Sequence, residues 1–294
     1  MILKLRHELH CYPELSGREK ETAQRIVGFF NKYNPDKIET NIGGYGLISS
    51  YEFSADGPTI VIRCDLDALA IDEHTELEYK SLNKGVSHKC GHDGHMAIVA
   101  GLAPWLSERH FKKGKVHLLF QPAEETGTGA LAMLESNLLK KLNPDYVIAL
   151  HNLPSFPLHT VIIGEGQMTP TVISITISLR GRVAHAAEPQ NGINPTLAIS
   201  TLNMAITNLA NNDTEDPSYS MITPVHTRIG SKDFGISPGE GELSFTLRTW
   251  NKETMVQLRK EIKRIIEDTC ILYNLEHSIK ESDYFPSVEN SDKC

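Results

Sequence analysis

Three short apolar runs constrain the fold of this chain more than any other feature. They are "TIVIRCD" (59–65), "KVHLLFQ" (115–121) and "DYVIALH" (145–151). Such runs are typical of strands that are buried on both faces, as in a parallel or mixed sheet covered by helices. The stretches near 94–108 and 128–140 have helical composition. The first 163 residues therefore predict an α/β layer fold.

A further helix is expected near the start of the chain. "SGRE" (16–19) has the pattern of a capping box, and apolar residues follow it at helical spacing. This pattern predicts a helix over about 17–33.

The second half of the chain has a different pattern. "VISITISLR" (172–180) alternates strictly between apolar and polar residues, which predicts a half-exposed strand of an antiparallel sheet. A helix (193–210), strands (219–229 and 241–249), a second helix (252–273) and a last strand (275–281) are expected to follow. The order β-α-β-β-α-β predicts a ferredoxin-like sandwich. Turn-rich sequence near 163–170 and 283–287 indicates its boundaries.

Composition limits the partners and the compartment. The net charge is −8 and no basic run occurs, which argues against nucleic acid and anionic membranes as partners. No apolar run reaches the roughly 18 residues of a membrane span. The five cysteines are scattered, odd in number and without a CxxC pair. Together with a start that lacks a signal-peptide pattern, they predict a cytoplasmic protein.

Residues with catalytic chemistry cluster where the apolar runs end, which is where open α/β sheets place their sites. Asp65 and Asp67 end the first run, and their i, i+2 spacing allows both to face one crevice. A role as a helix cap or turn residue is equally open for them.

The segment "SHKCGHDGHM" (87–96) is the densest cluster. Cys90 and His92 are flanked there by His88 and His95. A thiolate and neutral imidazoles suit zinc or manganese-like ions. The alternative is a cysteine nucleophile beside a base.

Two further clusters follow the second and third runs. Glu124 and Glu125 are adjacent, and such a pair repels unless a positive charge holds it. His151 ends the third run as a further candidate ligand. The combination predicts hydrolysis assisted by a metal, in which the metal lowers the pKa of a bridging water and a carboxylate takes its proton.

These motifs, in this order, resemble peptidase family M20. The closest resemblance is to its branch of aminoacylases, hippurate hydrolases, N-acetyldiaminopimelate deacetylases and auxin-conjugate hydrolases. The matching segments are "RHELHCYPELSGRE" (6–19), "RCDLDALAI" (63–71), "HKCGHDGH" (88–95), "FQPAEETGTGA" (120–130), "HNLP" (151–154), "GRVAHAAEPQNGINP" (181–195) and "ISPGEGELSFTLRTW" (236–250).

The resemblance implies an α/β fold with two domains. A mixed-sheet metallohydrolase catalytic domain would cover 1–165 plus 286–294, and an inserted ferredoxin-like α+β lid or dimerisation domain would cover 166–285. Two divalent ions, zinc or manganese with cobalt as a further option, would be bound by Cys90, His92, Glu125 and His151, with Cys90 bridging.

The resemblance also implies roles in catalysis. Glu124 would be the general base, and Asp67 would orient the site. His185 would reach across a homodimer, formed through the lid, to polarise the scissile carbonyl. Arg248 would hold the substrate carboxylate. The implied reaction is hydrolysis of the amide bond of an N-acyl amino acid or small peptide.

The sequence departs from the family at two places. Gly235 stands where many relatives carry an asparagine that assists the carbonyl oxygen. The family also returns from the lid to complete its sheet and to supply a last histidine ligand, whereas this sequence stops at Cys294, and His277 in the lid is no substitute. The alternative hypothesis is therefore a truncated, catalytically incompetent member that acts at most as a dimerising metal-binding protein.

Overall fold

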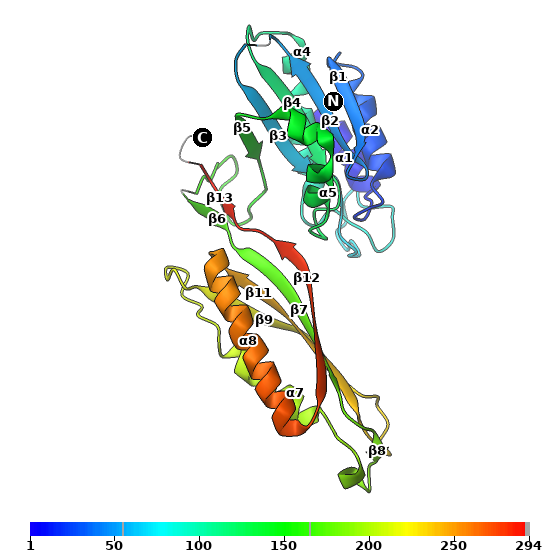
Figure 1. The fold of residues 1–294 in the computed structure, drawn as a ribbon. Coiled ribbons are helices and arrows are strands. Elements are labelled where there is room, and N and C mark those ends of the chain that lie inside the picture. The colour runs from blue at the N-terminus through cyan, green and yellow to red at the C-terminus, as the bar shows by residue number, and fades with distance from the viewer. Residues whose placement is uncertain (55, 165, 292–294) are drawn as a thin grey trace. The chain divides into compact units, whose positions relative to one another are not determined.

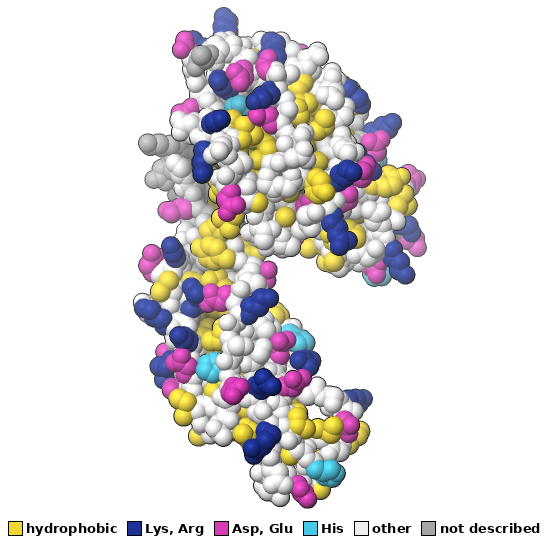
Figure 2. Space-filling view, turned by 45° about the vertical axis from the view of Figure 1, so that its right-hand side comes forward, with side chains coloured by type: hydrophobic (Ala, Val, Ile, Leu, Met, Phe, Trp, Pro, Cys, Tyr) yellow, Lys and Arg dark blue, Asp and Glu magenta, His cyan; other side chains and the backbone are white. Residues whose placement is uncertain are grey.

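The computed structural model describes residues 1–54, 56–164 and 166–291. It divides into two compact units, Met1–Thr160 and Val161–Cys294. No helix in the described residues is long and apolar enough to cross a membrane. On the face shown in Figure 2, acidic and basic side chains of the described residues are interspersed without a continuous basic surface.

The first unit contains a five-stranded mixed sheet in the order β1-β2-β4-β3-β5 (Figure 1). β4, β3 and β5 are parallel neighbours, whereas β1 and β2 pair in antiparallel fashion. The strands are β1 (Lys37–Ile42), β2 (Gly46–Glu52), β3 (Thr59–Asp65), β4 (Lys115–Gln121) and β5 (Tyr146–Ala149). The sheet confirms the predicted α/β class, although the sequence analysis did not include β1 and β2.

Helices cover both faces of this sheet. They are α1 (Ile2–Cys11), α2 (Lys20–Phe30), α3 (His92–Ala100), α4 (Ala103–Ser107), α5 (Gly129–Glu135) and α6 (Asn137–Leu142). Consecutive residues of β4 alternate between the two faces. Leu118 packs with Ile26 of α2 and Met96 of α3, whereas Leu119 packs with Met133 of α5. The two expected helices at 94–108 and 128–140 are thus each divided into two short ones.

The predicted capping box is wrong. α2 begins at Lys20, the side chain of its N-cap residue Glu19 makes no capping bond, and the Glu14 carboxylate accepts the N–H of Thr22 in the first turn (2.7 Å). The Ser16 hydroxyl instead donates to Asp67 (2.7 Å), and the Glu19 carboxylate accepts the backbone N–H of Ala123 (2.8 Å). Both side chains are therefore used in contacts with the sheet edge, which local sequence does not reveal.

The prediction of burial on both faces is also wrong for the third apolar run. All four residues of β5 are exposed, and Val147 is 60% exposed. β5 is an edge strand that pairs only with β3 among the described residues. An edge strand has neighbours on one side, so apolar composition alone does not ensure burial.

The second unit is built around a four-stranded antiparallel sheet in the order β12-β7-β11-β9. Its elements are β6 (Gln167–Thr169), β7 (Thr171–Arg180), β8 (Ala184–His185), a 3₁₀ turn (Pro189–Asn191), α7 (Thr196–Thr207), β9 (Ser220–Ile229), β10 (Ile236–Ser237), β11 (Glu240–Thr249), α8 (Lys252–Tyr273), β12 (Glu276–Phe285) and β13 (Val288–Glu289). The predicted β-α-β-β-α-β order is confirmed.

Both long helices of the second unit pack on one face of its sheet. Ile177 of β7, Phe245 of β11 and Ile266 of α8 are fully buried in this core. The opposite face is half-exposed and polar, and there Thr176 and Ser244 form a hydrogen bond of 3.0 Å across the strands. The alternation read in "VISITISLR" therefore corresponds to the two faces of β7.

Candidate metal centre

Candidate site residues follow the carboxyl ends of three strands, at one edge of the first unit. Because β4, β3 and β5 are parallel neighbours, their carboxyl ends lie side by side. Asp67 follows β3, Glu124 follows β4 and His151 follows β5. α3 begins with His92, which contacts Asp67 and lies near Glu124. Residues distant in sequence therefore meet at this edge.

The first group of possible ligands joins the cysteine to two histidines. The ligand atoms of Cys90, His92 and His151 all lie within 4.8 Å of one another. The distance from Cys90 Sγ to His151 Nε2 is 3.3 Å. Gly91, between Cys90 and His92, has φ +94° and permits the left-handed turn that begins α3.

The second group joins the same histidine to the paired glutamates. His92 Nε2 lies 3.9 Å from both Glu124 Oε2 and Glu125 Oε1. His92 is fully buried, whereas both glutamate side chains are partly exposed. His92 therefore lies at the centre of both groups, and the predicted ligands Cys90, His92, Glu125 and His151 are brought together.

Asp67 is a buried residue that contacts members of both ligand groups. The Nδ1–H of His92 donates to the backbone carbonyl of Asp67 (2.8 Å), which leaves the Nε2 lone pair directed at the cluster. The Asp67 side chain is fully buried and accepts from Ser16 Oγ (2.7 Å) and the backbone N–H of Glu125 (3.0 Å). Asp67 thus contacts both a histidine and the glutamate turn.

The electrostatics of the cluster favour positive charge. The hydrogen bond with His151 and the nearby His92 lower the pKa of the Cys90 thiol. Burial opposes a charge on His92, but the nearby Asp67 carboxylate and Cys90 thiol outweigh burial and raise its pKa. Burial raises the pKa of Glu125, although the nearby His92 partly offsets this effect. A cation at this position would relieve the buried acidic groups.

The donor set fits a divalent metal. Nε2 of His92 and Oε1 of Glu125 are buried and have no hydrogen-bond partner within the described chain, a condition that is costly unless another group satisfies them. Sulfur, imidazole nitrogen and carboxylate oxygen are the ligands of zinc and similar ions, whereas magnesium and calcium prefer oxygen alone.

Two further candidates from the sequence, one carboxylate and one imidazole, lie outside both sets of possible ligands. Asp65 pairs with Arg63 (2.5 Å), and burial raises the Asp65 pKa to about 6. His88 is buried, and its burial lowers the pKa to about 4.

Sequence reasoning missed the residues that support the site. His95 lies within hydrogen-bond distance of both the side-chain oxygen (2.6 Å) and the backbone N–H (2.9 Å) of Asn152, next to His151. Glu19 holds Ala123 beside the glutamate pair. The sequence indicated His95 only as a neighbour of Cys90 and His92, and the segments "PELSGRE" and "HNLP" contain Glu19 and Asn152, but only the fold shows what these residues contact.

His185 and Arg248 lie in the second unit. His185 is exposed in β8, and its Nδ1 accepts the backbone N–H of Ala187 (3.1 Å). Arg248 lies in β11 on the half-exposed face of the sheet. The roles implied for them, like the domain limits 1–165 plus 286–294 and 166–285, stay predictions.

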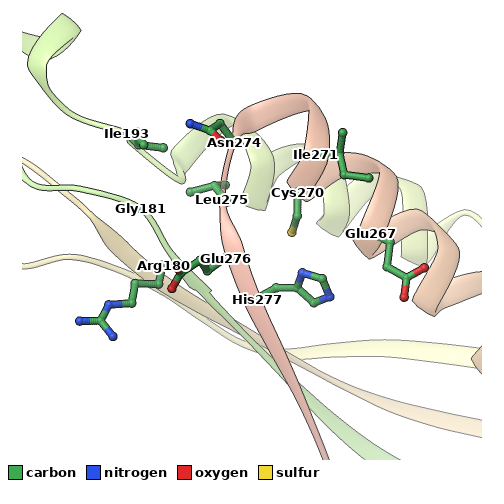
Figure 3. A pocket seen from close by; sticks show the side chains of 10 residues that line it. All are labelled: Arg180, Gly181, Ile193, Glu267, Cys270, Ile271, Asn274, Leu275, Glu276 and His277. Carbon is green, nitrogen blue, oxygen red and sulfur yellow. The ribbon is translucent and has the colours of Figure 1, made fainter.

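The second unit also contains a pocket of about 1020 Å³ where α8 leads into β12 (Figure 3). Cys270 and Glu267 of α8 line it, together with His277 of β12. The lining residues include none of the candidate ligands of the first unit, so the pocket does not define the metal centre.

Comparisons with known proteins agree with this chemistry. A family model described as "Peptidase family M20/M25/M40" matches residues 61–292. An N-acetylcysteine deacetylase of Bacillus subtilis (strain 168) is 30% identical over 290 residues, which are 98% of this chain and 76% of that enzyme. An N-acetyldiaminopimelate deacetylase of the same strain is 32% identical over 290 residues, or 99% of this chain and 77% of that enzyme.

A solved structure shows the same similarity. The crystal structure of a dinuclear metal-binding peptidase from the M20 family of Bacillus subtilis matches with a TM-score of 0.80 and 29% identity. The match covers 99% of this chain and 75% of that one. This chain therefore spans about three quarters of the length of these relatives.

Proposed function

Because this chain belongs to peptidase family M20/M25/M40 and is a hydrolase of the aminoacylase type, we propose that it cleaves the amide bond of N-acylated amino acids. The observation that carries the proposal is the grouping of Cys90, His151 and the two glutamates around His92. N-acetylated amino acids are the first substrates to test, because the named relatives are deacetylases of such compounds. Small peptides are the second class.

Two divalent ions, of zinc, manganese or cobalt, are proposed as cofactors. A thiolate sulfur has several lone pairs, so Cys90 would be a ligand that both ions share. His92, Glu125 and His151 would be the further ligands. When bound, such ions supply a water of lowered pKa and polarise the substrate carbonyl. A thiolate ligand requires reduced cysteine, and the four cysteines of the described chain are free, in keeping with a proposed cytoplasmic location.

Glu124 is proposed as the general base. Its side chain is 29% exposed, so substrate and water can reach it, and Oε2 lies 3.9 Å from His92 Nε2. The carboxylate would accept a proton from the attacking water. It would then deliver that proton to the amide nitrogen as the carbon–nitrogen bond breaks. Asp67 would keep His92 and the turn of Glu125 in place.

Residues of the second unit are proposed to complete the substrate site. His185 would polarise the scissile carbonyl from a partner subunit, and Arg248 would pair with the substrate carboxylate. Gly235 has no side chain to assist the carbonyl oxygen, which gives His185 a larger share of that role.

A homodimer through the second unit is part of this proposal. Within the described chain, β9 is an edge strand beside β11, and apart from a bridge between its first residue, Ser220, and Asn211 its outer edge is unpaired. Met221 and Val225 are exposed along β9, and Leu197 and Met204 are exposed on the adjacent α7. Exposed strand edges and apolar side chains are typical of such interfaces.

The proposal is tested with a panel of N-acetyl and N-benzoyl amino acids and dipeptides in the presence of zinc, manganese or cobalt. Chelation should abolish hydrolysis and added metal should restore it, and metal analysis should give two ions per chain. Activity that persists after chelation would refute metal-assisted hydrolysis. A chain that binds no metal would instead agree with the incompetent alternative.

Glu124→Gln tests the base directly. The amide cannot accept the proton, so kcat should fall by about 10²–10⁴-fold while two ions remain bound. Glu21→Gln is the matched control, because Glu21 is exposed on α2, and it should leave kcat unchanged. Unchanged kcat in Glu124→Gln would remove Glu124 from the mechanism.

A cysteine hydrolase is the second candidate, because Cys90 Sγ lies 3.3 Å from His151 Nε2. In that mechanism the thiolate attacks the carbonyl and the histidine acts as base. Thiol alkylation would then abolish activity, while complete removal of metal would leave it intact.

A further inference from the structure

The turn that carries the two glutamates has an unfavourable backbone conformation. Ala123, directly before Glu124, has φ +48°, in the left-handed region that L side chains rarely adopt. Its carbonyl accepts the N–H of Gly129 (3.1 Å), which closes the turn. A left-handed alanine persists only where its surroundings hold it, so another contact is expected to fix this turn.

Glu19 provides that contact from a distant part of the chain. Its side chain is fully buried, and Oε1 accepts the N–H of Ala123 at 2.8 Å across 104 residues of sequence. The same oxygen accepts the N–H of Gly17 at 2.9 Å. The contact with Gly17 is local, whereas the contact with Ala123 joins the start of α2 to the turn after β4.

A second buried carboxylate holds the other side of the same turn. Asp67 Oδ2 accepts the N–H of Glu125 at 3.0 Å. The two peptide N–H groups that flank Glu124 therefore each donate to a buried carboxylate, one from Glu19 and one from Asp67. Burying two carboxylates at one turn is costly, and charge-assisted hydrogen bonds to backbone N–H groups are strong enough to define a geometry.

We propose that Glu19 is a positioning residue of the reaction, which fixes the direction of Glu124 by holding the N–H of Ala123. The inference rests on the proposed role of Glu124 as general base. Among the described residues, the hydrogen bonds of the Glu19 side chain go to the N–H groups of Gly17 and Ala123 and not to a candidate ligand. Its effect is on the approach of the Glu124 carboxylate to the attacking water, and misplacement of a catalytic group by about 1 Å can cost about 10²-fold in rate.

Two conservative variants separate geometry from charge. Glu19→Gln keeps the length of the side chain and an oxygen that accepts from Ala123, but removes the charge. Glu19→Asp keeps the charge, but it is one methylene shorter and withdraws the acceptor. Neither leaves a large cavity, so both are expected to fold. Glu21→Gln and Glu21→Asp, at an exposed position in the first turn of α2, are matched controls.

The value of kcat should depend on the position of the oxygen that accepts from Ala123 and not on the charge of residue 19. Glu19→Asp should lower kcat about 10–100-fold with KM within about threefold and with metal content unchanged. Glu19→Gln should stay within about fivefold of the parent kcat, and both Glu21 variants should match the parent. Equal losses in the two Glu19 variants, no loss in either, or a larger loss in Glu19→Gln would each overturn the proposal.

Hydrogen exchange provides a readout that does not depend on turnover. In the full 294-residue chain, the Ala123 amide should exchange faster in Glu19→Asp and retain its protection in Glu19→Gln. If the parent chain hydrolyses nothing in the substrate panel, the proposed function fails by itself. The exchange of this amide still decides whether Glu19 holds the turn, and equal exchange in all variants would refute that.

Discussion

Gly91→Ala is a sharp test of the metal-centre geometry, because Gly91 lies between Cys90 and His92. The glycine has φ +94°, and a non-glycine residue in left-handed backbone costs about 1–2 kcal/mol. The new Cβ would lie 2.5 Å from Asn152 Oδ1 and 3.0 Å from its Cγ. The substitution therefore strains the backbone and pushes on the residue that follows His151.

The overlap with Asn152 cannot be relieved without a cost in free energy. The Asn152 side-chain oxygen lies 2.6 Å from His95 Nε2, so rotation of the side chain gives up a hydrogen bond worth about 0.5–1.5 kcal/mol. If it does not rotate, overpacking costs about 1–3 kcal/mol. Added to the backbone strain, these costs should lower the free energy of unfolding of Gly91→Ala by about 1.5–3.5 kcal/mol if Asn152 rotates and by about 2–5 kcal/mol if it does not.

Gly85→Ala is the matched control. Gly85 has φ +76°, and a Cβ there would meet only Asp72 Oδ1, at 4.0 Å. It should cost the backbone strain alone, about 1–2 kcal/mol. The free energies of unfolding of the two variants in urea should therefore differ by about 0.5–3 kcal/mol, and competition with a chelator should show about 10–100-fold weaker metal binding in Gly91→Ala only. Equal stabilities and equal metal affinities would refute the reasoning.

Two predictions concern the two cores. Burial lowers the pKa of His117, which contacts Ser50 at 2.8 Å, so its unfolded form binds a proton more readily, and stability is lost as pH falls below the unfolded value of about 6.5. Between pH 7.5 and 5, urea unfolding should show a larger loss of stability for the parent than for His117→Asn; equal losses would exclude His117 as a cause. Ile177→Ala, in the fully buried core of the second unit, should cost about 2–5 kcal/mol, whereas Ser174→Ala on the opposite face should change thermal stability by less than about 0.5 kcal/mol; similar melting temperatures would contradict the assigned faces.

The second unit was the more predictable part of the fold. Strict alternation from Ile173 to Leu179 specified which face of β7 is buried, because a strand repeats every two residues. Periodicity in α8 was equally regular, and Leu258, Ile262 and Ile266 are all buried. Both signals are local, so they can be read without knowledge of the partners.

Features that depend on distant partners were not predictable from local sequence. "SGRE" satisfies the capping pattern, but Ser16 and Glu19 make contacts with Asp67 and Ala123 instead. The apolar residues of β5 indicated burial, whereas strand order places β5 at an edge. Short breaks within helices, as at Ser136 with ψ 136° between α5 and α6, leave no strong composition signal.

The members of the candidate metal centre could be predicted from the sequence, whereas the residues that contact them could not. Cysteine, histidine and paired glutamates are rare enough at strand ends to indicate ligands from their chemistry. Their meeting around His92 follows from the parallel order of β4, β3 and β5. Glu19 contacts the backbone N–H of Ala123 and Asn152 contacts His95, and residue type alone does not reveal such contacts.

The second unit begins and ends at neighbouring positions, since Val172 of β7 lies opposite Phe285 of β12 and β6 pairs with β13. Paired strands are about 5 Å apart, so the whole intervening block can be cut out and the gap closed by a short turn. Recombination could thus exchange the block as a cassette without rebuilding the hydrophobic interior of the first unit.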